Sequence, residues 1–127
     1  MQNLLEQLTF QDGLIPTVIV DARDGRVLTL CYMDEEALKR TLETEKVHVF
    51  RRSKGRVMLK GETSGHVQRV RDIRKDCEGK SLEFVVKQEV AGCHKGYRSC
   101  YFEKYDPETD SFEITDELVF DPDSVYE

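Results

Sequence analysis

The sequence predicts an α+β fold in which mostly antiparallel strands carry one or two packed helices. Short runs of β-branched residues alternate with turn residues through most of the chain, and one segment consists of helix-forming residues throughout. The chain has 127 residues and shows no internal repeat, low-complexity tract or linker. We therefore expect residues 1–127 to form one domain.

The first predicted unit is a β-hairpin. Its strands are the β-branched runs Thr17–Val20 and Val27–Leu30. Between them lies Asp24-Gly25, a dipeptide that accepts the positive φ angles of a tight turn.

A helix is predicted directly after this hairpin, over the segment EEALKRTLETEK. Asp34 precedes it as a candidate N-cap, and Glu35 and Glu36 suit the positive end of the helix dipole. The inward-facing stripe would comprise Ala37, Leu38, Thr41 and Leu42.

After the helix, apolar and polar residues alternate, which predicts strands. VHVFRR and RVMLK form a second hairpin across SKG. HVQRVRDIR spaces its apolar residues by three, which predicts a bulge or an irregular strand. SLEFVVKQEV follows a turn at EGK, with Leu82, Phe84 and Val86 on one face. CYFEKYD and SFEIT form a third hairpin around DPETD.

The composition indicates where the chain works. No stretch approaches the roughly 20 apolar residues that span a bilayer. The segment MQNLLEQLTF lacks the basic region and long apolar run of a signal peptide. We therefore expect a cytoplasmic protein without a membrane partner, whose four cysteines serve metal binding or catalysis more than disulfides.

The net charge of −6 hides a strong asymmetry. Residues 51–75 carry nine Lys/Arg against Glu62 and Asp72, whereas residues 103–127 carry ten acids against Lys104. A basic segment in an acidic protein indicates a local anionic ligand, although a solvated strand face would give the same charges. A nucleic-acid-binding domain would spread its positive charge more broadly, so we expect no nucleic-acid partner.

Residues 93–100, CHKGYRSC, concentrate reactive side chains, and Cys77 adds a further thiol. The remaining cysteine, Cys31, lies in an apolar run and is expected to be a buried thiol. The gap between Cys93 and Cys100 is wider than in a typical zinc knuckle. It leaves three alternatives open: a catalytic zinc with one free position, a structural zinc closed by a ligand such as His94, and thiols without metal.

The loop GETSGH, residues 61–66, combines glycines with hydroxyl side chains. Free backbone N–H groups beside hydroxyls suit a phosphate cradle, although a plain polar loop would look the same. Basic neighbours that would neutralise a phosphate are Lys54, Arg56 and Lys60.

Two carboxylates, Asp76 and Glu78, flank Cys77. Because side chains of a strand alternate between its faces, the carboxylates would point away from the sulfur. Hard oxygen ligands suit Mg²⁺ and a soft thiolate suits Zn²⁺, so two separate metals are geometrically reasonable here.

Three motifs in order, KGETSGHVQRV, DCEG and CHKGYRSCYF, resemble the phosphoribosyl-AMP cyclohydrolase family of histidine biosynthesis. The likeness extends from about Val27 to Phe102 and includes YMDEEAL and RRSKGR. It implies a homodimer whose active site spans the subunit interface, with zinc held by Cys93 and Cys100 of one subunit and Cys77 of the other.

The resemblance also implies a magnesium ion at an Asp-Cys-Asp-x-Asp cluster. This chain has Asp76, Glu78 and Lys80 at the three acidic positions. Glu78 is an acceptable replacement ligand, whereas a charged Lys80 cannot bind a cation. Magnesium would then be held by two carboxylates with water and substrate phosphate, or the Lys80 ammonium would partly replace it.

The reaction implied by the resemblance is hydrolysis of phosphoribosyl-AMP, in which a zinc-bound hydroxide attacks C6 of the adenine and the N1–C6 bond breaks. His94 is the candidate general base or proton shuttle, because imidazole titrates near working pH. His66 is a second candidate, and Glu62 is a candidate for handling the proton at N1.

The substrate carries two phosphate groups, so two anion sites are needed. The residues assigned to them together are Arg51, Arg52, Ser53, Lys54, Lys60, Ser64 and Gly65. Arg98 is expected either to hold a phosphate or to pair with Asp76 across the dimer.

Three alternatives stand beside this interpretation. One is a related cyclohydrolase that acts on another nucleotide, which the departure at Lys80 motivates. Another is a zinc-stabilised module that binds nucleic acid, with affinity that falls steeply with salt. The third is a nucleoside or base deaminase, but its H-x-E and P-C-x-x-C stretches do not occur in this sequence.

Overall fold

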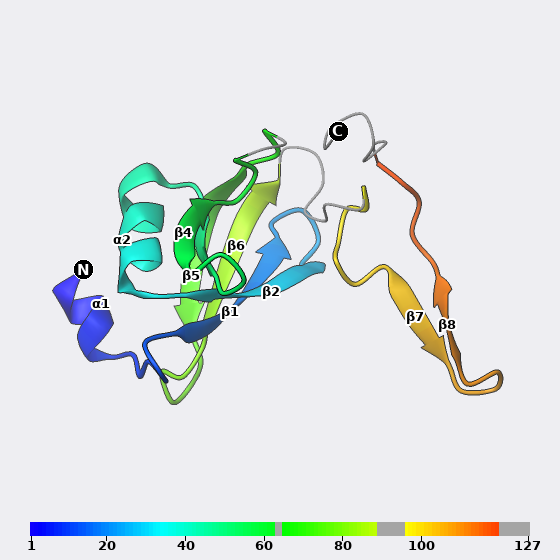
Figure 1. The fold of residues 1–127 in the computed structure, drawn as a ribbon, viewed down its shortest axis with the longest axis horizontal. Helices are drawn as coiled ribbons and strands as arrows, with labels where there is room; N and C mark the ends of the chain where they lie inside the picture. Colours follow the sequence, from blue (N-terminus) through cyan, green and yellow to red (C-terminus); the bar gives the residue numbers. More distant parts are fainter. Residues whose placement is uncertain (63–64, 89–95, 120–127) are drawn as a thin grey trace.

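A computed structural model of the chain describes residues 1–62, 65–88 and 96–119. Its main layer is a four-stranded sheet in the order β2-β1-β6-β5 (Figure 1). The predicted α+β class, with mostly antiparallel strands, is confirmed. The strands of this sheet are β1 (Ile15–Asp21), β2 (Val27–Met33), β5 (Gln68–Lys75) and β6 (Leu82–Gln88).

The first hairpin forms as predicted, although both of its strands are longer than expected. Gly25 adopts a φ of +77° in its turn and donates its N–H to the Asp21 carbonyl oxygen at 2.8 Å. Sequence reasoning did not anticipate the other neighbour of β1. β6 lies parallel to it, with Thr17 opposite Leu82 and Asp21 opposite Val86.

The predicted helix is α2 (Glu35–Thr44). The Asp34 carboxylate caps it by accepting the Ala37 N–H at 2.7 Å, which satisfies one of the free N–H groups at the helix start. The predicted stripe is buried at Ala37, Leu38 and Thr41, and Leu42 is half-buried. A short helix that the sequence analysis did not predict, α1 (Gln2–Glu6), precedes the sheet.

A second hairpin, β3 (His48–Arg51) and β4 (Arg56–Leu59), pairs as predicted. It packs with α2 against the sheet, and Val47 and Val57 join Ile19, Phe84 and other residues in one hydrophobic core. The predicted irregularity in β5 is a bulge between Val70 and Asp72. We call this unit, residues 1–88, the body.

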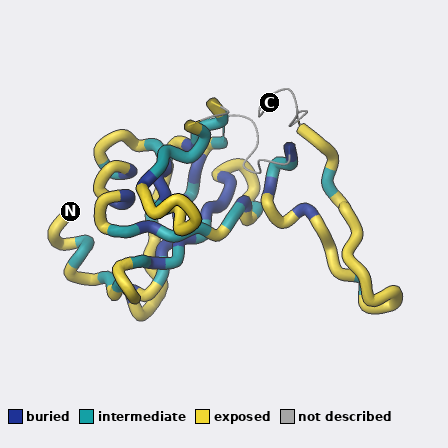
Figure 2. The backbone as a smooth tube through the Cα atoms, viewed as in Figure 1, coloured by how far each residue is buried: buried dark blue, intermediate teal, exposed yellow. Residues whose placement is uncertain are grey.

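The third predicted hairpin consists of β7 (Glu103–Asp106) and β8 (Ser111–Ile114), and it extends away from the body (Figure 1). We call residues 103–114 the C-terminal hairpin. Nearly all of it is exposed, in contrast to the buried strands of the body (Figure 2). Across the described residues, no helix is long and apolar enough to cross a membrane.

Candidate active site

Cys100 ends a short segment, residues 98–100, that lies against the start of β2. Its backbone N–H donates to the Leu28 carbonyl oxygen at 2.7 Å. The Ser99 hydroxyl donates to the Val27 carbonyl oxygen at 2.7 Å, and Ser99 is buried. These contacts fix the backbone while the Cys100 thiol remains free and exposed. An exposed thiol on a fixed backbone is able to bind a metal ion.

Lys60 and Cys100 both lie near Cys31. Burial raises the pKa of the Cys31 thiol to about 12, Lys60 acts in the opposite direction, and Cys100 adds to the rise. The expected buried character of Cys31 is confirmed only in part: the residue is half-buried, packs against the core and donates to the Thr17 carbonyl oxygen.

Cys77 lies in the turn between β5 and β6 and is exposed. Asp76 organises this turn. One of its carboxylate oxygens accepts the N–H groups of Glu78 at 3.0 Å and Lys80 at 2.9 Å, and the other accepts the Ser81 hydroxyl at 2.7 Å. The Ser81 hydroxyl and the backbone donors lower the pKa of Asp76. Asp76 is therefore an ionised carboxylate with its oxygens directed into the turn.

The arrangement at Asp76 and Glu78 does not match what magnesium requires. Both Asp76 oxygens accept hydrogen bonds from the turn, and Glu78 is ion-paired with Lys80 at 2.8 Å. Mg²⁺ needs free oxygens in octahedral geometry. These residues do not fit magnesium as they stand, and its binding there remains a prediction.

Within one chain, Cys77 and Cys100 lie at different corners of the sheet. Cys100 contacts β2, and Cys77 lies beyond the start of β6, with β1 between these two strands. Two strand spacings amount to about 10 Å, whereas two sulfurs on one tetrahedral zinc lie about 4 Å apart. Among the described residues no three potential ligands gather into a metal site.

Three predicted site residues lie outside the described residues: the zinc ligand Cys93, the candidate base His94 and Ser64 of the 61–66 loop. The donor set of Cys77, Cys93 and Cys100 fits zinc in its chemistry, because three soft thiolates leave one position for water. Cys77 and Cys100 are available for it as free thiols.

Of the predicted phosphate-binding residues of the first basic loop, Arg51 ends β3, and residues 52–54 lie in the β3–β4 turn. Lys54 and Gly55 both donate their N–H groups to the Arg51 carbonyl oxygen, at 3.0 and 2.7 Å. The Arg52 guanidinium lies 4.1 Å from the centre of the Tyr32 ring, which fixes its direction by a cation–π contact. Arg51, Arg52, Ser53 and Lys54 are all exposed and accessible to an anion.

The 61–66 loop is tightly closed. Gly61 has a φ of +88°, and a Cβ there would lie 2.6 Å from the His66 backbone. Gly65 donates its N–H to the Gly61 carbonyl oxygen at 2.7 Å. Glu62 is exposed and His66 is half-buried. Ser64 lies outside the described residues, so the predicted cradle is described only at its glycines.

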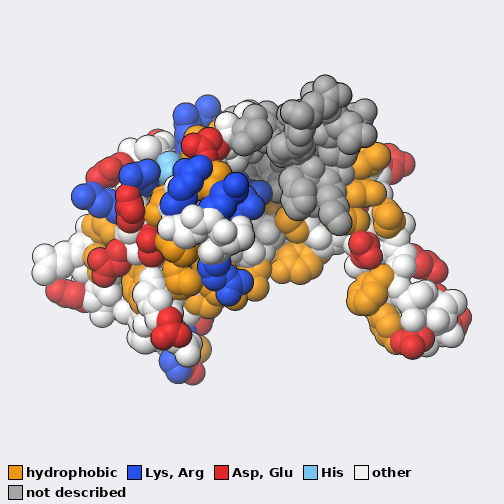
Figure 3. All heavy atoms as spheres, viewed as in Figure 1, with side chains coloured by type: hydrophobic (Ala, Val, Ile, Leu, Met, Phe, Trp, Pro, Cys, Tyr) orange, Lys and Arg blue, Asp and Glu red, His pale blue; other side chains and the backbone are white. Residues whose placement is uncertain are grey.

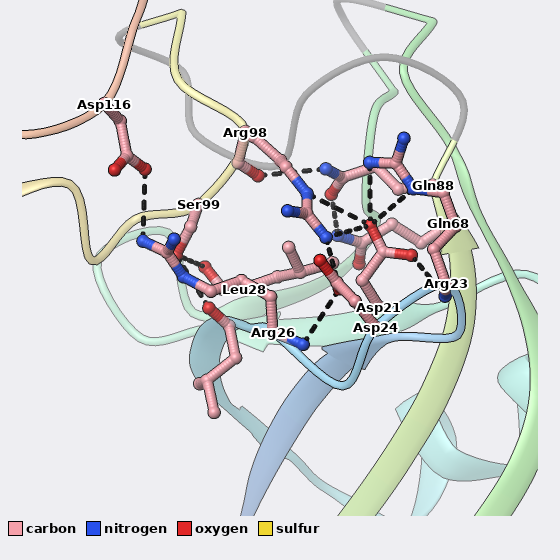
Figure 4. Close-up of polar contacts among 11 residues, drawn as sticks. Asp21, Arg23, Asp24, Arg26, Leu28, Gln68, Gln88, Arg98, Ser99 and Asp116 are labelled. Atoms are coloured by element: carbon pink, nitrogen blue, oxygen red, sulfur yellow. Dashed lines mark hydrogen bonds and ion pairs between the residues drawn. The ribbon is translucent and has the colours of Figure 1, made fainter.

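Arg98 contacts two carboxylates of its own chain (Figure 4). Its guanidinium donates to Asp21 Oδ2 at 3.2 and 3.0 Å and also to Asp24 Oδ1. Its carbonyl oxygen accepts the Gln88 side-chain amide at 2.9 Å. A phosphate contact and a pairing with Asp76 both stay predictions for Arg98.

Sequence reasoning did not assign a role at the site to Asp21, Asp24 or Gln88. Asp24 was noticed only as a turn residue, and nothing local marks Asp21 as the partner of a residue 77 positions away. Burial by itself would raise the pKa of Asp21, but hydrogen bonds from Arg23 and Arg98 hold it below its usual value. Asp21 is therefore an ionised carboxylate whose side chain is 1% exposed.

Comparison with known proteins gives a consistent match. A family model described as phosphoribosyl-AMP cyclohydrolase matches residues 29–102. A phosphoribosyl-AMP cyclohydrolase from Haloquadratum walsbyi is 45% identical over 91% of this chain and 84% of its own length. One from Methanothermobacter thermautotrophicus is 44% identical over 91% and 83%.

A longer relative, the histidine biosynthesis bifunctional protein HisIE from Thermoanaerobacter pseudethanolicus, is 41% identical over the whole chain and 58% of its own length. The family model spans more than half of the chain and contains the thiols, the basic turn and the glycine loop described above. The chain therefore belongs to the phosphoribosyl-AMP cyclohydrolase family.

Proposed function

We propose that this chain hydrolyses the adenine ring of phosphoribosyl-AMP, opening the N1–C6 bond, as a step of histidine biosynthesis. The observation that carries the proposal is the family match over residues 29–102, which contains every predicted thiol ligand and basic site residue. The structure supports it by leaving the Cys100 thiol exposed on a segment whose backbone is fixed against β2.

The proposal includes a zinc ion held by Cys93 and Cys100 of one subunit and Cys77 of a second. In support, one chain separates Cys77 from Cys100 by more than the distance that two ligands of one ion allow. When bound, zinc supplies a water nucleophile at neutral pH by lowering the pKa of that water.

A homodimer is proposed for a second reason. The C-terminal hairpin exposes the large apolar side chains of Phe112 and Ile114. It also carries mostly acidic charge, whereas the body gathers Lys and Arg side chains (Figure 3). Opposite charge around an uncovered apolar surface favours contact between two copies of the chain.

In this proposal the chain's own residues bind and orient the substrate. The exposed β3–β4 turn, with Arg51, Arg52, Ser53 and Lys54, neutralises one phosphate, and Lys60 with the 61–66 loop contacts the other. His94 accepts the proton of the attacking water, with His66 as the second candidate. The proton taken from the water is delivered to N1 as the N1–C6 bond breaks, with Glu62, which is exposed, as the candidate that relays it. Cytoplasmic location stays a prediction.

The test is to follow ring opening of phosphoribosyl-AMP by ultraviolet absorbance with the zinc-loaded protein. Turnover is expected to disappear with Cys100→Ser and after treatment with a strong chelator, and to return when zinc is restored. Cys31→Ser is the matched control, since Cys31 packs against the core and should leave turnover within a few-fold.

A folded, zinc-loaded dimer that does not turn over this substrate would contradict the proposal and favour a related enzyme acting on another nucleotide. The turn that contains Asp76, Glu78 and Lys80 calls for a second measurement, in which turnover is compared with and without added Mg²⁺. Because Asp76 and Glu78 are already engaged by the turn and by Lys80, we expect turnover to show little dependence on added Mg²⁺.

A further inference from the structure

The segment that carries Cys100 is held to the body through its side chains as well as its backbone. Arg98 forms two hydrogen bonds to one oxygen of Asp21, at 3.2 and 3.0 Å, and a further one to Asp24. Asp21 ends β1, and Asp24 lies in the β1–β2 turn. The Arg98 guanidinium therefore binds both sides of the β1–β2 turn (Figure 4). This turn leads into β2, the strand that Cys100 contacts.

The same segment is held at three successive residues, through the main chain at Arg98 and Cys100 and through the side-chain hydroxyl at Ser99. The Arg98 carbonyl oxygen accepts from Gln88, the Ser99 hydroxyl donates to Val27, and the Cys100 N–H donates to Leu28. Gln88 ends β6, so contacts from β1, β2 and β6 converge on residues 98–100. Only the Cys100 thiol is left exposed and uncommitted.

We propose that Asp21 and Arg98 are positioning residues, which set the Cys100 thiol for metal binding through the fixed 98–100 segment. This inference rests on the proposed function, because it takes Cys100 as a zinc ligand. Residues that hold a metal ligand in position without contacting the metal act by preorganisation. Their loss weakens metal binding by about 10- to 100-fold.

Burial makes this pair better suited to positioning than an ordinary surface ion pair. The Asp21 side chain is 1% exposed and that of Arg98 is 25% exposed. A buried carboxylate loses water on folding, so it is retained only where charged donors meet it in a fixed geometry. The two-bonded guanidinium fork provides such a geometry, and it restricts rotation of the segment.

Arg23 provides a matched control for Asp21. It also donates to Asp21 Oδ2, at 3.3 and 3.2 Å, but its side chain is 71% exposed. Within the part of the chain that the structure describes, its side chain bonds to Asp21 and not to residues 96–100. Its backbone N–H bond to Asp21 at 2.9 Å survives replacement by alanine. Arg23→Ala therefore removes a positively charged partner of the Asp21 carboxylate but leaves the contacts of the Cys100 segment in place.

The experiment measures zinc affinity of the full-length protein by competition with a chromophoric chelator, and records the thiolate charge-transfer bands after replacement of zinc by Co²⁺. Asp21→Asn and Arg98→Gln are expected to weaken zinc binding at least tenfold and to alter the Co²⁺ bands. Arg23→Ala should bind zinc within twofold of the wild type. Circular dichroism and sedimentation confirm that each variant folds and associates.

The zinc affinity of the double variant Asp21→Asn/Arg98→Gln should equal that of the single variant with the lower affinity. The two losses should not add, because both residues act through one contact. In turnover by Asp21→Asn, kcat should fall while KM changes little, since Asp21 is not assigned to the substrate; Arg98 is also a predicted phosphate contact, so the kinetic readout is taken from Asp21→Asn. Asp24→Asn removes only the outer carboxylate and should have a smaller effect than Arg98→Gln. If Asp21→Asn does not fold, the comparison of Asp24→Asn with Arg98→Gln serves as the test.

Zinc affinity unchanged in Asp21→Asn or Arg98→Gln would overturn the inference, as would an equal loss in Arg23→Ala. If the wild type binds zinc and is active, either of these two results would overturn only the inference and would leave the proposed function intact. A folded wild type that takes up no zinc would instead overturn the proposed function, and this inference with it.

Discussion

Phe84 and Phe112 show how differently the two regions of this molecule are built. Phe84 of the body is fully buried in the hydrophobic core, whereas Phe112 of the C-terminal hairpin is 65% exposed. Both lie in short strands with alternating patterns, so the sequence gives them the same local signal. The body covers its apolar faces with its own residues, and the hairpin does not.

The hairpin is nevertheless anchored at its base. Arg26 donates to the Tyr101 carbonyl oxygen at 2.9 Å and pairs with Asp116 at 3.1 Å. Tyr97 and Phe102 stack with ring centres 3.9 Å apart. A two-stranded hairpin alone in water is marginally stable. A fixed base below an exposed apolar strand indicates a surface that another molecule covers, which agrees with the proposed dimer.

The largest expected effect compares the same substitution in both regions. Phe84→Ala should lower the free energy of unfolding by about 3–5 kcal/mol, because it leaves a cavity in the core. Phe112→Ala should change the stability of the isolated subunit by less than about 0.5 kcal/mol. Chemical denaturation of both variants at low protein concentration provides the comparison. Equal losses would mean that Phe112 is packed in the subunit.

The second prediction concerns self-association. Phe112 and Ile114 are two positions apart in β8 and share a face, so replacing both with serine removes one apolar patch. We expect the dimer dissociation constant to rise at least tenfold in sedimentation equilibrium. Glu113→Gln, on the opposite face, is the control and should leave association nearly unchanged. A double variant that associates like the wild type would place the interface elsewhere.

Smaller effects come from single hydrogen bonds. Asp34→Ala removes the α2 cap in the body and should cost about 1 kcal/mol of unfolding free energy. Tyr105→Phe removes the exposed contact of its hydroxyl with Asp110, at 2.6 Å in the C-terminal hairpin, and should cost only a few tenths of a kcal/mol. Thermal unfolding of the two variants measures the difference, and a reversed order would contradict the comparison.

The smallest effect is confined to acid and concerns Asp21, at the junction of the two regions. Its folded pKa lies below the ordinary value of 3.8, so its ionised form stabilises the fold above that value. This contribution is lost as the pH falls below 3.8 and through the lowered folded pKa. The unfolding free energy of Asp21→Asn should therefore approach that of the wild type as the pH falls below 3.8 and through the lowered pKa. A constant gap would refute this.

Residue patterns along the chain predicted the local elements well. The capped helix at Asp34, the hairpin turn at Asp24-Gly25 and the bulge in β5 all form where their patterns indicate. These features depend on residues a few positions apart, and their energetics are local. The short helix α1 was missed, because five residues without a side-chain cap give little signal.

The sequence by itself determined the α+β class, the three hairpins, the helix α2 and the family to which the chain belongs. Only the tertiary structure decided that β6 lies parallel to β1, that Asp21 meets Arg98, and that Cys77 and Cys100 occupy different corners of one sheet. Contacts between distant residues depend on how whole elements pack to bury their shared core, and no short stretch of sequence encodes that packing.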